Sequence, residues 1–207
     1  MRCTRSRGPR GFFCLQVDRR GPVIFAVITL RQMELPTFRY HPNPVASGAV
    51  EPERARCECC ERMVDHIYVA STYSTHDIDK LCPWCIADGT AHEKFDAEFA
   101  DPYPLRDAGI DESIIAEVTT RTPGFISWQQ EIWLSHCNNA CVFVGDATVD
   151  VVGKMTNDEI DYLLQDHGVS REQFKEMAAN YQPGGRPAIY HFKCLECDSN
   201  LFGMDYT

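Results

Sequence analysis

The eleven cysteines are the feature that most constrains how this chain folds. Most of them stand in pairs separated by two or three residues, and such close pairing is typical of metal-binding turns. A disulfide framework instead spreads its partners along a short secreted chain. With 207 residues, 44% of them hydrophobic, the chain is long enough to bury a core without disulfides. We therefore interpret most of the cysteines as metal ligands.

Two Cys-x2-Cys turns, each called a knuckle below, form the first predicted site. They are Cys57 with Cys60 and Cys82 with Cys85, and the 21 residues between them match the zinc-ribbon pattern of two knuckles joined by a hairpin. A knuckle lets two thiolates bind one zinc ion while nearby amides donate to the sulfurs. The alternatives are free thiols that pack as small hydrophobic groups, or disulfides.

The second predicted site is less regular. Its ligands are Cys137 with Cys141, a Cys-x3-Cys pair, and Cys194 with Cys197. The 52 residues between the two pairs are enough to hold helices as an insertion. We expect zinc at both sites, and because four thiolates leave no room for water, both sites are predicted to be structural and not catalytic.

Two further residues remain as alternative ligands. Cys59 is left over and offers a replacement for Cys60, and His136 stands directly before Cys137. Glu61 and Asp198 follow the first and last knuckles at a position where glycine is common, so we expect both turns to be distorted.

Residues 1–32 differ in composition from the rest of the chain. They hold seven arginines and one acid, Asp18. Removing these from the 20 basic and 30 acidic residues leaves 13 and 29 in the other 175, a formal charge of −16. We expect 1–32 to be a non-native extension before a start at Met33, with a targeting segment as the alternative. No stretch is long and apolar enough to cross a bilayer, so we expect a cytoplasmic protein without membrane contact.

The body, 33–207, is predicted to be an α+β protein in which small zinc-ribbon-like β units alternate with capped helices. Pro123-Gly124 is a candidate boundary between two zinc-bearing halves, 33–123 and 124–207. Capping residues predict helices over 91–100, 112–120, 157–167 and 171–181, starting after Thr90, Asp111, Thr156 and Ser170. Strands are expected over 66–73, 142–144, 188–193 and 201–205, and 125–134 stays undecided between helix and strand.

Several segments resemble the bacterial CbrC family, and the resemblance covers residues 33–207. The family takes its name from a colicin-tolerance protein and its biochemical activity is uncharacterised. The resemblance therefore implies a role in stress or colicin tolerance without implying a mechanism. The segments that carry it are Leu35–Pro42, Cys57–Cys60, Leu81–Gly89, Arg121–Phe125, Trp128–Glu131, Trp133, His136-Cys137, Cys141–Gly145 and Phe192–Cys197.

Closed metal sites and an acidic surface favour a non-enzymatic module that binds another protein. One alternative is a thiol-disulfide oxidoreductase that uses Cys82-Pro83-Trp84-Cys85, although Asp88-Gly89 interrupts the helix that would lower the pKa of the first thiol. Another is a zinc-ribbon nucleic-acid binder, against which the net charge argues. Its basic residues would be Arg54, Arg56, Arg62 and Lys80. The sequence does not indicate an oligomeric state.

Overall fold

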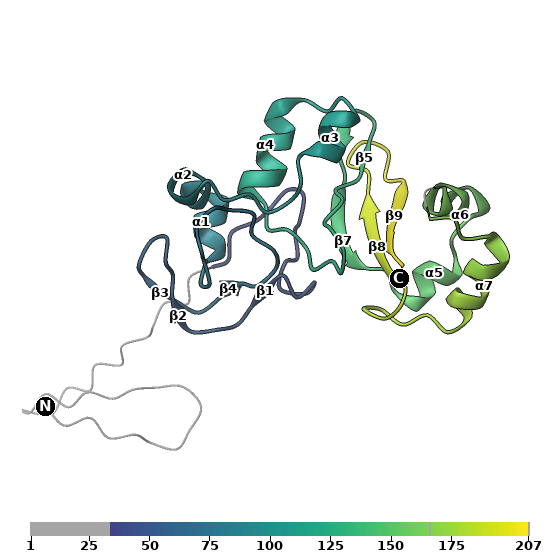
Figure 1. Ribbon diagram of the computed structural model, residues 1–207, viewed down its shortest axis with the longest axis horizontal. Coiled ribbons are helices and arrows are strands. Elements are labelled where there is room, and N and C mark those ends of the chain that lie inside the picture. Colours follow the sequence, from purple (N-terminus) through teal and green to yellow (C-terminus); the bar gives the residue numbers. More distant parts are fainter. Residues whose placement is uncertain (1–33, 166, 207) are drawn as a thin grey trace, which may run out of the picture. The chain divides into compact units, whose positions relative to one another are not determined.

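Four small antiparallel sheets and seven short helices make up the part of the chain that the structure describes, residues 34–165 and 167–206 (Figure 1). The structure is a computed structural model. The predicted extension, residues 1–32, lies outside the described residues. From Leu35 onward the chain forms one compact unit. No helix among the described residues is both long and apolar enough to cross a membrane.

The first sheets are two-stranded and surround the first cysteine site. Strand β1 pairs with β4, and β2 pairs with β3 in a tight hairpin. Two short helices follow and lie beside these sheets in Figure 1. The bounds are Val50–Glu51 for β1, Ala55–Arg56 for β2, Met63–Val64 for β3, Ile67–Tyr68 for β4, Pro83–Ala87 for α1 and Thr90–Phe95 for α2.

Two further helices, α3 and α4, connect this region to the rest of the unit. Helix α3 is Tyr103–Asp107 and α4 is Glu112–Arg121. The Asp111 side chain accepts a hydrogen bond from the Ser113 backbone N–H at 2.9 Å, so α4 begins where the capping residue predicts. Its buried face includes Ile115 and Val118.

The remaining strands form the β5–β6 hairpin and a three-stranded sheet in the order β7-β8-β9. Three helices, α5 to α7, lie in the connection between β7 and β8 (Figure 1); the two predicted there are α6 and α7, and α5 was not predicted. The bounds are Ser135–His136 for β5, Asn139–Ala140 for β6, Val142–Asp146 for β7, Val149–Gly153 for α5, Asn157–Leu164 for α6, Arg171–Ala179 for α7, Ala188–Lys193 for β8 and Asn200–Asp205 for β9.

Hydrophobic side chains gather in three buried clusters. One surrounds the first cysteine site, and another lies between β8, β9 and α5 to α7. The third combines Tyr40 and the α4 face with stacked aromatic rings; the centroids of Phe125 and Phe143 are 4.4 Å apart. This third cluster draws side chains from both sides of Pro123-Gly124. The division into halves 33–123 and 124–207 stays a prediction.

Gly124 lies where two of these clusters meet. A β-carbon added there would stand 2.0 Å from the carbonyl oxygen of Phe99 and 2.9 Å from the hydroxyl of Tyr68. Phe99 and Tyr68 belong to the cluster around the first cysteines, whereas the next residue, Phe125, belongs to the aromatic cluster. The absence of a side chain at this position therefore permits the close approach.

The mixed α+β class is confirmed, and three local predictions need correction. The strand expected over 66–73 is β4, which is only two residues long, Ile67–Tyr68, because bends and coil follow it. The helix expected over 91–100 is α2, which ends at Phe95 because Asp96 turns left-handed. Gly89 is its N-cap, so the capping box expected at Thr90 does not form; the Thr90 hydroxyl donates to Asp88 at 2.6 Å instead. Residues 125–134, left undecided, form neither helix nor strand.

Candidate metal centres

The first knuckle, Cys57 to Cys60, forms the tip of the β2–β3 hairpin. The Cys57 backbone N–H donates to the Arg62 carbonyl at 2.9 Å, and the Glu61 N–H donates back to the Cys57 carbonyl at 2.8 Å. Glu61 has φ 58° in this turn, which is the left-handed conformation that favours glycine. The two bonds fold the turn so that the sulfurs of Cys57 and Cys60 join the same group of ligand atoms.

The second knuckle places its two cysteines at the start of helix α1. Cys82 is the extended N-cap residue, and Pro83 occupies the first turn, where a missing N–H costs nothing. The helix carries Cys85 back toward Cys82, so that their sulfurs lie 3.5 Å apart. Glu58 ties the two knuckles together, because its carboxylate accepts the Lys80 N–H at 2.8 Å and its own N–H donates to the Lys80 carbonyl.

These four cysteines form the group called site 1 below. Their sulfurs all lie within 4.8 Å of one another, with 3.9 Å from Cys57 to Cys85 and 3.9 Å from Cys60 to Cys82. Cys57, Cys82 and Cys85 are buried in the surrounding hydrophobic cluster. This donor set fits a closed tetrahedral zinc site.

The electrostatics of site 1 show what the thiols do without a cation. Hydrogen bonds with the thiols of Cys82 and Cys85 hold the pKa of Cys57 well below its ordinary value. The hydrogen bond to Cys57 raises the pKa of Cys82 to about 12, and the same partner raises the pKa of Cys85. The Cys57 thiolate is thus favoured among its neighbours, whereas Cys82 and Cys85 would need a divalent cation to ionise.

The last knuckle, Cys194 to Cys197, forms the tip of the β8–β9 hairpin and repeats the geometry of the first. The Cys194 N–H donates to the Ser199 carbonyl at 2.9 Å, and the Asp198 N–H donates to the Cys194 carbonyl at 3.2 Å. Asp198 has φ 57°, as Glu61 does in the first turn. At both positions where distortion was expected, the structure has a non-glycine residue in the left-handed conformation.

The β5–β6 hairpin supplies the other two ligand atoms of the second group. Cys137 and Asn138 form its two-residue turn, with φ 51° and 56°, as a primed hairpin turn requires. The Nδ1 atom of His136 lies 3.2 Å from the Cys137 sulfur and 3.4 Å from the Cys197 sulfur, and the two sulfurs are 3.8 Å apart. His136, Cys137, Cys194 and Cys197 are called site 2 below.

The structure places His136 in site 2 and leaves Cys141 outside it. Cys141 follows β6, so two strand residues, about 7 Å of extended chain, separate it from the turn that carries Cys137. It is fully buried in the aromatic cluster, and burial raises the pKa of its thiol to about 12. In the sequence, the position of His136 directly before Cys137 was the signal that the histidine could be a ligand. In the structure, the β5–β6 turn brings both side chains to the same group of ligand atoms.

The other predicted residues lie around site 1 without joining it. Cys59 is buried, and its sulfur is 3.7 Å from the Thr90 hydroxyl. Arg56 pairs with Glu61 at 2.8 Å and Lys80 pairs with Glu53 at 3.1 Å. Basic side chains proposed for nucleic acid are thus partly engaged by neighbouring carboxylates.

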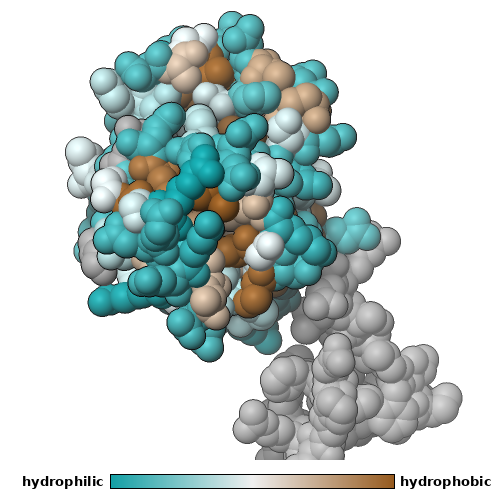
Figure 2. Space-filling model, turned by 90° about the vertical axis from the view of Figure 1, so that its right-hand side faces the viewer, coloured by the Kyte–Doolittle hydropathy of each residue, from teal (hydrophilic) through white to brown (hydrophobic). Residues whose placement is uncertain are grey.

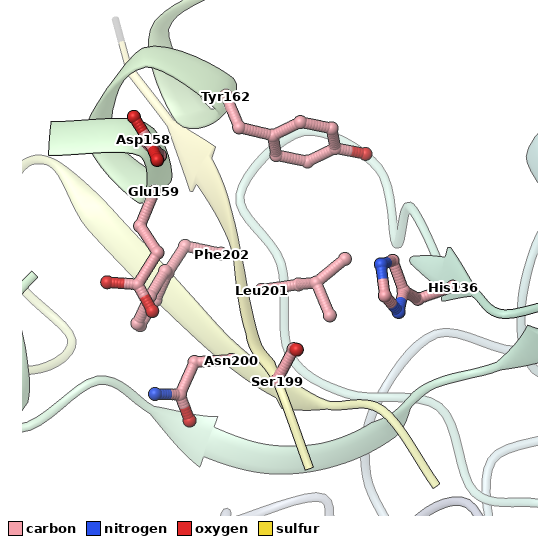
Figure 3. A pocket seen from close by; sticks show the side chains of 8 residues that line it. All are labelled: His136, Asp158, Glu159, Tyr162, Ser199, Asn200, Leu201 and Phe202. Atoms are coloured by element: carbon pink, nitrogen blue, oxygen red, sulfur yellow. The ribbon is translucent and has the colours of Figure 1, made fainter. Parts of the chain in front are cut away.

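A pocket of about 260 Å³ opens beside site 2. His136 and Leu201 face one another across it, with the ring of Tyr162 on a further side (Figure 3). Figure 2 shows the side of the molecule that carries α6 and α7, where hydrophobic residues gather in a hollow among hydrophilic ones. The pocket is lined by His136, Asp158, Glu159, Tyr162, Ser199, Asn200, Leu201 and Phe202.

Comparison with known proteins gives consistent relatives. The profile of an uncharacterised protein family, UPF0167, matches residues 35–206. The UPF0167 protein PA1536 of Pseudomonas aeruginosa is 43% identical over 175 residues, covering 84% of this chain and 98% of the relative. The UPF0167 protein Mb2317 of Mycobacterium bovis is 34% identical over 183 residues, covering 86% and 97%. No solved structure matches this chain.

These findings overturn the expected resemblance to the CbrC family. The matching profile and the relatives carry the UPF0167 name, and none of them supports CbrC. The inferred role in colicin tolerance loses its basis with that resemblance.

Proposed function

The chain belongs to the uncharacterised protein family UPF0167, and from this premise we propose that it is a non-enzymatic zinc protein whose acidic surface binds another protein in the cytosol. Zinc at site 1 and site 2 holds hairpin tips that are too short to be stable alone. The nine described cysteines are free thiols, which fits a reducing compartment.

Site 1 carries the proposal. Four sulfurs within 4.8 Å of one another, three of them in buried residues, match the donor set of a structural zinc site. A fully occupied tetrahedron leaves no open position for water or substrate, so this site supplies stability and no Lewis-acid chemistry. Site 2 has a Cys3His donor set, which is also typical of structural zinc.

The thiol oxidoreductase alternative is disfavoured by the surroundings of Cys82. A redox-active first cysteine needs a lowered pKa, whereas the pKa of Cys82 is raised to about 12 by its hydrogen bond to Cys57. Helix α1 ends after five residues, so its dipole is short. Cys85 also lies beside Cys57, as a shared zinc site requires.

A protein partner is favoured over nucleic acid by charge. Residues 33–207 carry a formal charge of −16, which repels phosphates before any contact forms. The carboxylates of Glu61 and Glu53 already pair with two of the basic side chains near the first knuckle. A partner with a basic surface would be steered toward this protein.

Native mass spectrometry of the zinc-loaded chain tests the proposal. We expect two zinc ions per chain, and one ion after either Cys60→Ser or Cys197→Ser, because each change removes a ligand from one site. Cys59→Ser is the matched control and should retain two ions. A metal-free chain that keeps its near-ultraviolet circular dichroism and its partner in a pull-down would contradict the proposal.

A further inference from the structure

The two sites differ in their exposure to solvent. At site 1, Cys57, Cys82 and Cys85 are at most 1% exposed. At site 2 only Cys194 is buried, while His136, Cys137 and Cys197 are exposed. A small reagent in solution therefore meets two exposed cysteines at site 2, Cys137 and Cys197, against one partly exposed cysteine at site 1, Cys60.

The exposed sulfurs of site 2 also face each other. Cys137 and Cys197 have their sulfurs 3.8 Å apart, and a disulfide needs about 2.05 Å. Both residues lie in hairpin turns, Cys137 between β5 and β6 and Cys197 between β8 and β9. A shift of about 1.8 Å there breaks no strand pairing, because neither residue belongs to a ladder.

The pocket beside site 2 provides an approach. His136 and Ser199 line it, and the Ser199 hydroxyl lies 3.2 Å from the Cys197 sulfur (Figure 3). Its volume of about 260 Å³ is ample for a molecule of a few atoms. Cys197 is itself exposed, so a small oxidant in solution reaches its sulfur next to this pocket.

We propose that site 2 is an oxidation site, at which hydrogen peroxide links Cys137 to Cys197 and releases the bound metal. This inference rests on the proposed function, since it needs a loaded site 2. The Cys197 thiolate attacks one peroxide oxygen, so that an S–O bond forms, the O–O bond breaks and hydroxide leaves. The Cys137 thiolate then attacks that sulfur, forming the S–S bond and expelling a second hydroxide.

The step is balanced, because two thiolates lose two electrons and peroxide becomes two hydroxide ions. His136 and Cys194 remain as donors, and two donors are too few for a zinc site. Site 1 keeps its ion, because three of its four sulfurs belong to buried residues and only Cys60 is partly exposed. The fold around β1 to β4 would therefore persist, while the disulfide replaces the ion as the link between the β5–β6 hairpin and the last knuckle.

The test treats the full chain, first shown to hold two zinc ions, with hydrogen peroxide in the presence of a zinc-sensitive dye. We expect release of one ion per chain, a peptide map linking Cys137 to Cys197, and recovery of the ion after a thiol reductant. Cys59→Ser should behave like the wild type. In Cys137→Ser the oxidation should stop at a sulfenic acid on Cys197. If this variant does not bind two zinc ions, the peptide map of the oxidised wild-type chain decides between the outcomes.

Several results would overturn the inference while leaving the proposed function intact. They are release of both ions together, release of neither, a disulfide among the site 1 cysteines, or a disulfide between Cys194 and Cys197. A chain that never binds two ions would instead remove the proposed function and this inference with it.

Discussion

At the scale of single residues, Glu61 and Asp198 each occupy the left-handed position after a knuckle. A non-glycine residue pays roughly 1 kcal/mol for this conformation, and aspartate tolerates it better than glutamate does. The two turns nevertheless make the same pair of backbone hydrogen bonds. The hydrogen bonds of the closed turn therefore outweigh the local backbone cost.

Glu61→Gly should raise the free energy of unfolding of the zinc-loaded chain. The relief of the left-handed penalty is worth about 1 kcal/mol, and the exposed Arg56–Glu61 pair that is lost contributes little. Glu61→Ala is the matched control, since it loses the same ion pair and keeps the penalty. Urea unfolding should place the glycine variant above the alanine variant; equal stability would contradict this account of the turn.

His41 gives the protein a pH dependence that is separate from the metal sites. Its side chain is buried between the Pro123 carbonyl at 2.8 Å and the Ser47 hydroxyl at 2.7 Å. Burial lowers its pKa from 6.5 to about 4, against a smaller opposing effect of the Pro123 hydrogen bond. The unfolded chain therefore takes up this proton first, so the contribution is full above pH 6.5 and is lost as pH falls toward 4.

Between pH 7.5 and pH 5 the wild type should lose about 2 kcal/mol more stability than His41→Gln, which cannot titrate. The comparison is made by urea unfolding at constant free zinc, so that proton effects on the metal ligands cancel between the two proteins. Parallel pH profiles for wild type and variant would show that the imidazole is not responsible.

At the scale of elements, sequence reasoning succeeded where a local cap decides the structure. Thr156 with Glu159 and Ser170 with Gln173 form the capping boxes that open α6 and α7. It failed at Thr90, because Gly89 adopts a left-handed cap and Asp88 takes the threonine hydroxyl. Rules based on the propensity of each residue do not include such competition between neighbouring residues for the cap.

The same limit explains the candidate sites. The structure brings the four predicted cysteines of site 1 together in one group, and the regular spacing of the two knuckles was the signal for them. At site 2 the Cys-x3-Cys pair suggested Cys141, but the turn at Cys137-Asn138 directs the following strand away into the core. Cysteine spacing alone does not reveal where a hairpin turns. Residues 125–134 show no helical or strand periodicity in their hydrophobic residues, so their irregular course could not be predicted.

The β5–β6 hairpin leads to a direct test of the ligand set. Cys141→Ala should retain two zinc ions, because Cys141 lies outside both groups, whereas His136→Ala should lower the zinc affinity of site 2 by at least about 10-fold. Competition with a chelator dye measures both variants. Loss of one ion in Cys141→Ala with two retained in His136→Ala would reverse the assignment.

At the scale of the whole molecule, the contact at Gly124 joins the cluster around site 1 to the aromatic cluster that lies beneath site 2. The aromatic cluster itself includes Cys141 and Cys194. Stability is therefore shared between regions that lie far apart in the sequence, and damage at this contact should be felt throughout the compact unit.

Gly124→Ala should destabilise the protein by about 3 kcal/mol, because the new methyl group meets the Phe99 carbonyl and the backbone must move. Gly153→Ala is the matched control: nothing lies within 4 Å of its added β-carbon, and alanine favours helix α5, so no loss is expected. Thermal unfolding of the zinc-loaded variants measures both. A neutral Gly124→Ala would contradict the close approach.

The chain separation between ligands gives the two sites different assembly costs. Cys57 and Cys85 are 28 positions apart, whereas Cys137 and Cys197 are 60 apart, with α5 to α7 between them. A loop of about twice the length costs roughly 0.6 kcal/mol more entropy to close. Site 1 also leaves the ribosome first. During synthesis, therefore, the four cysteines of site 1 can come together while the last knuckle that completes site 2 has yet to be made.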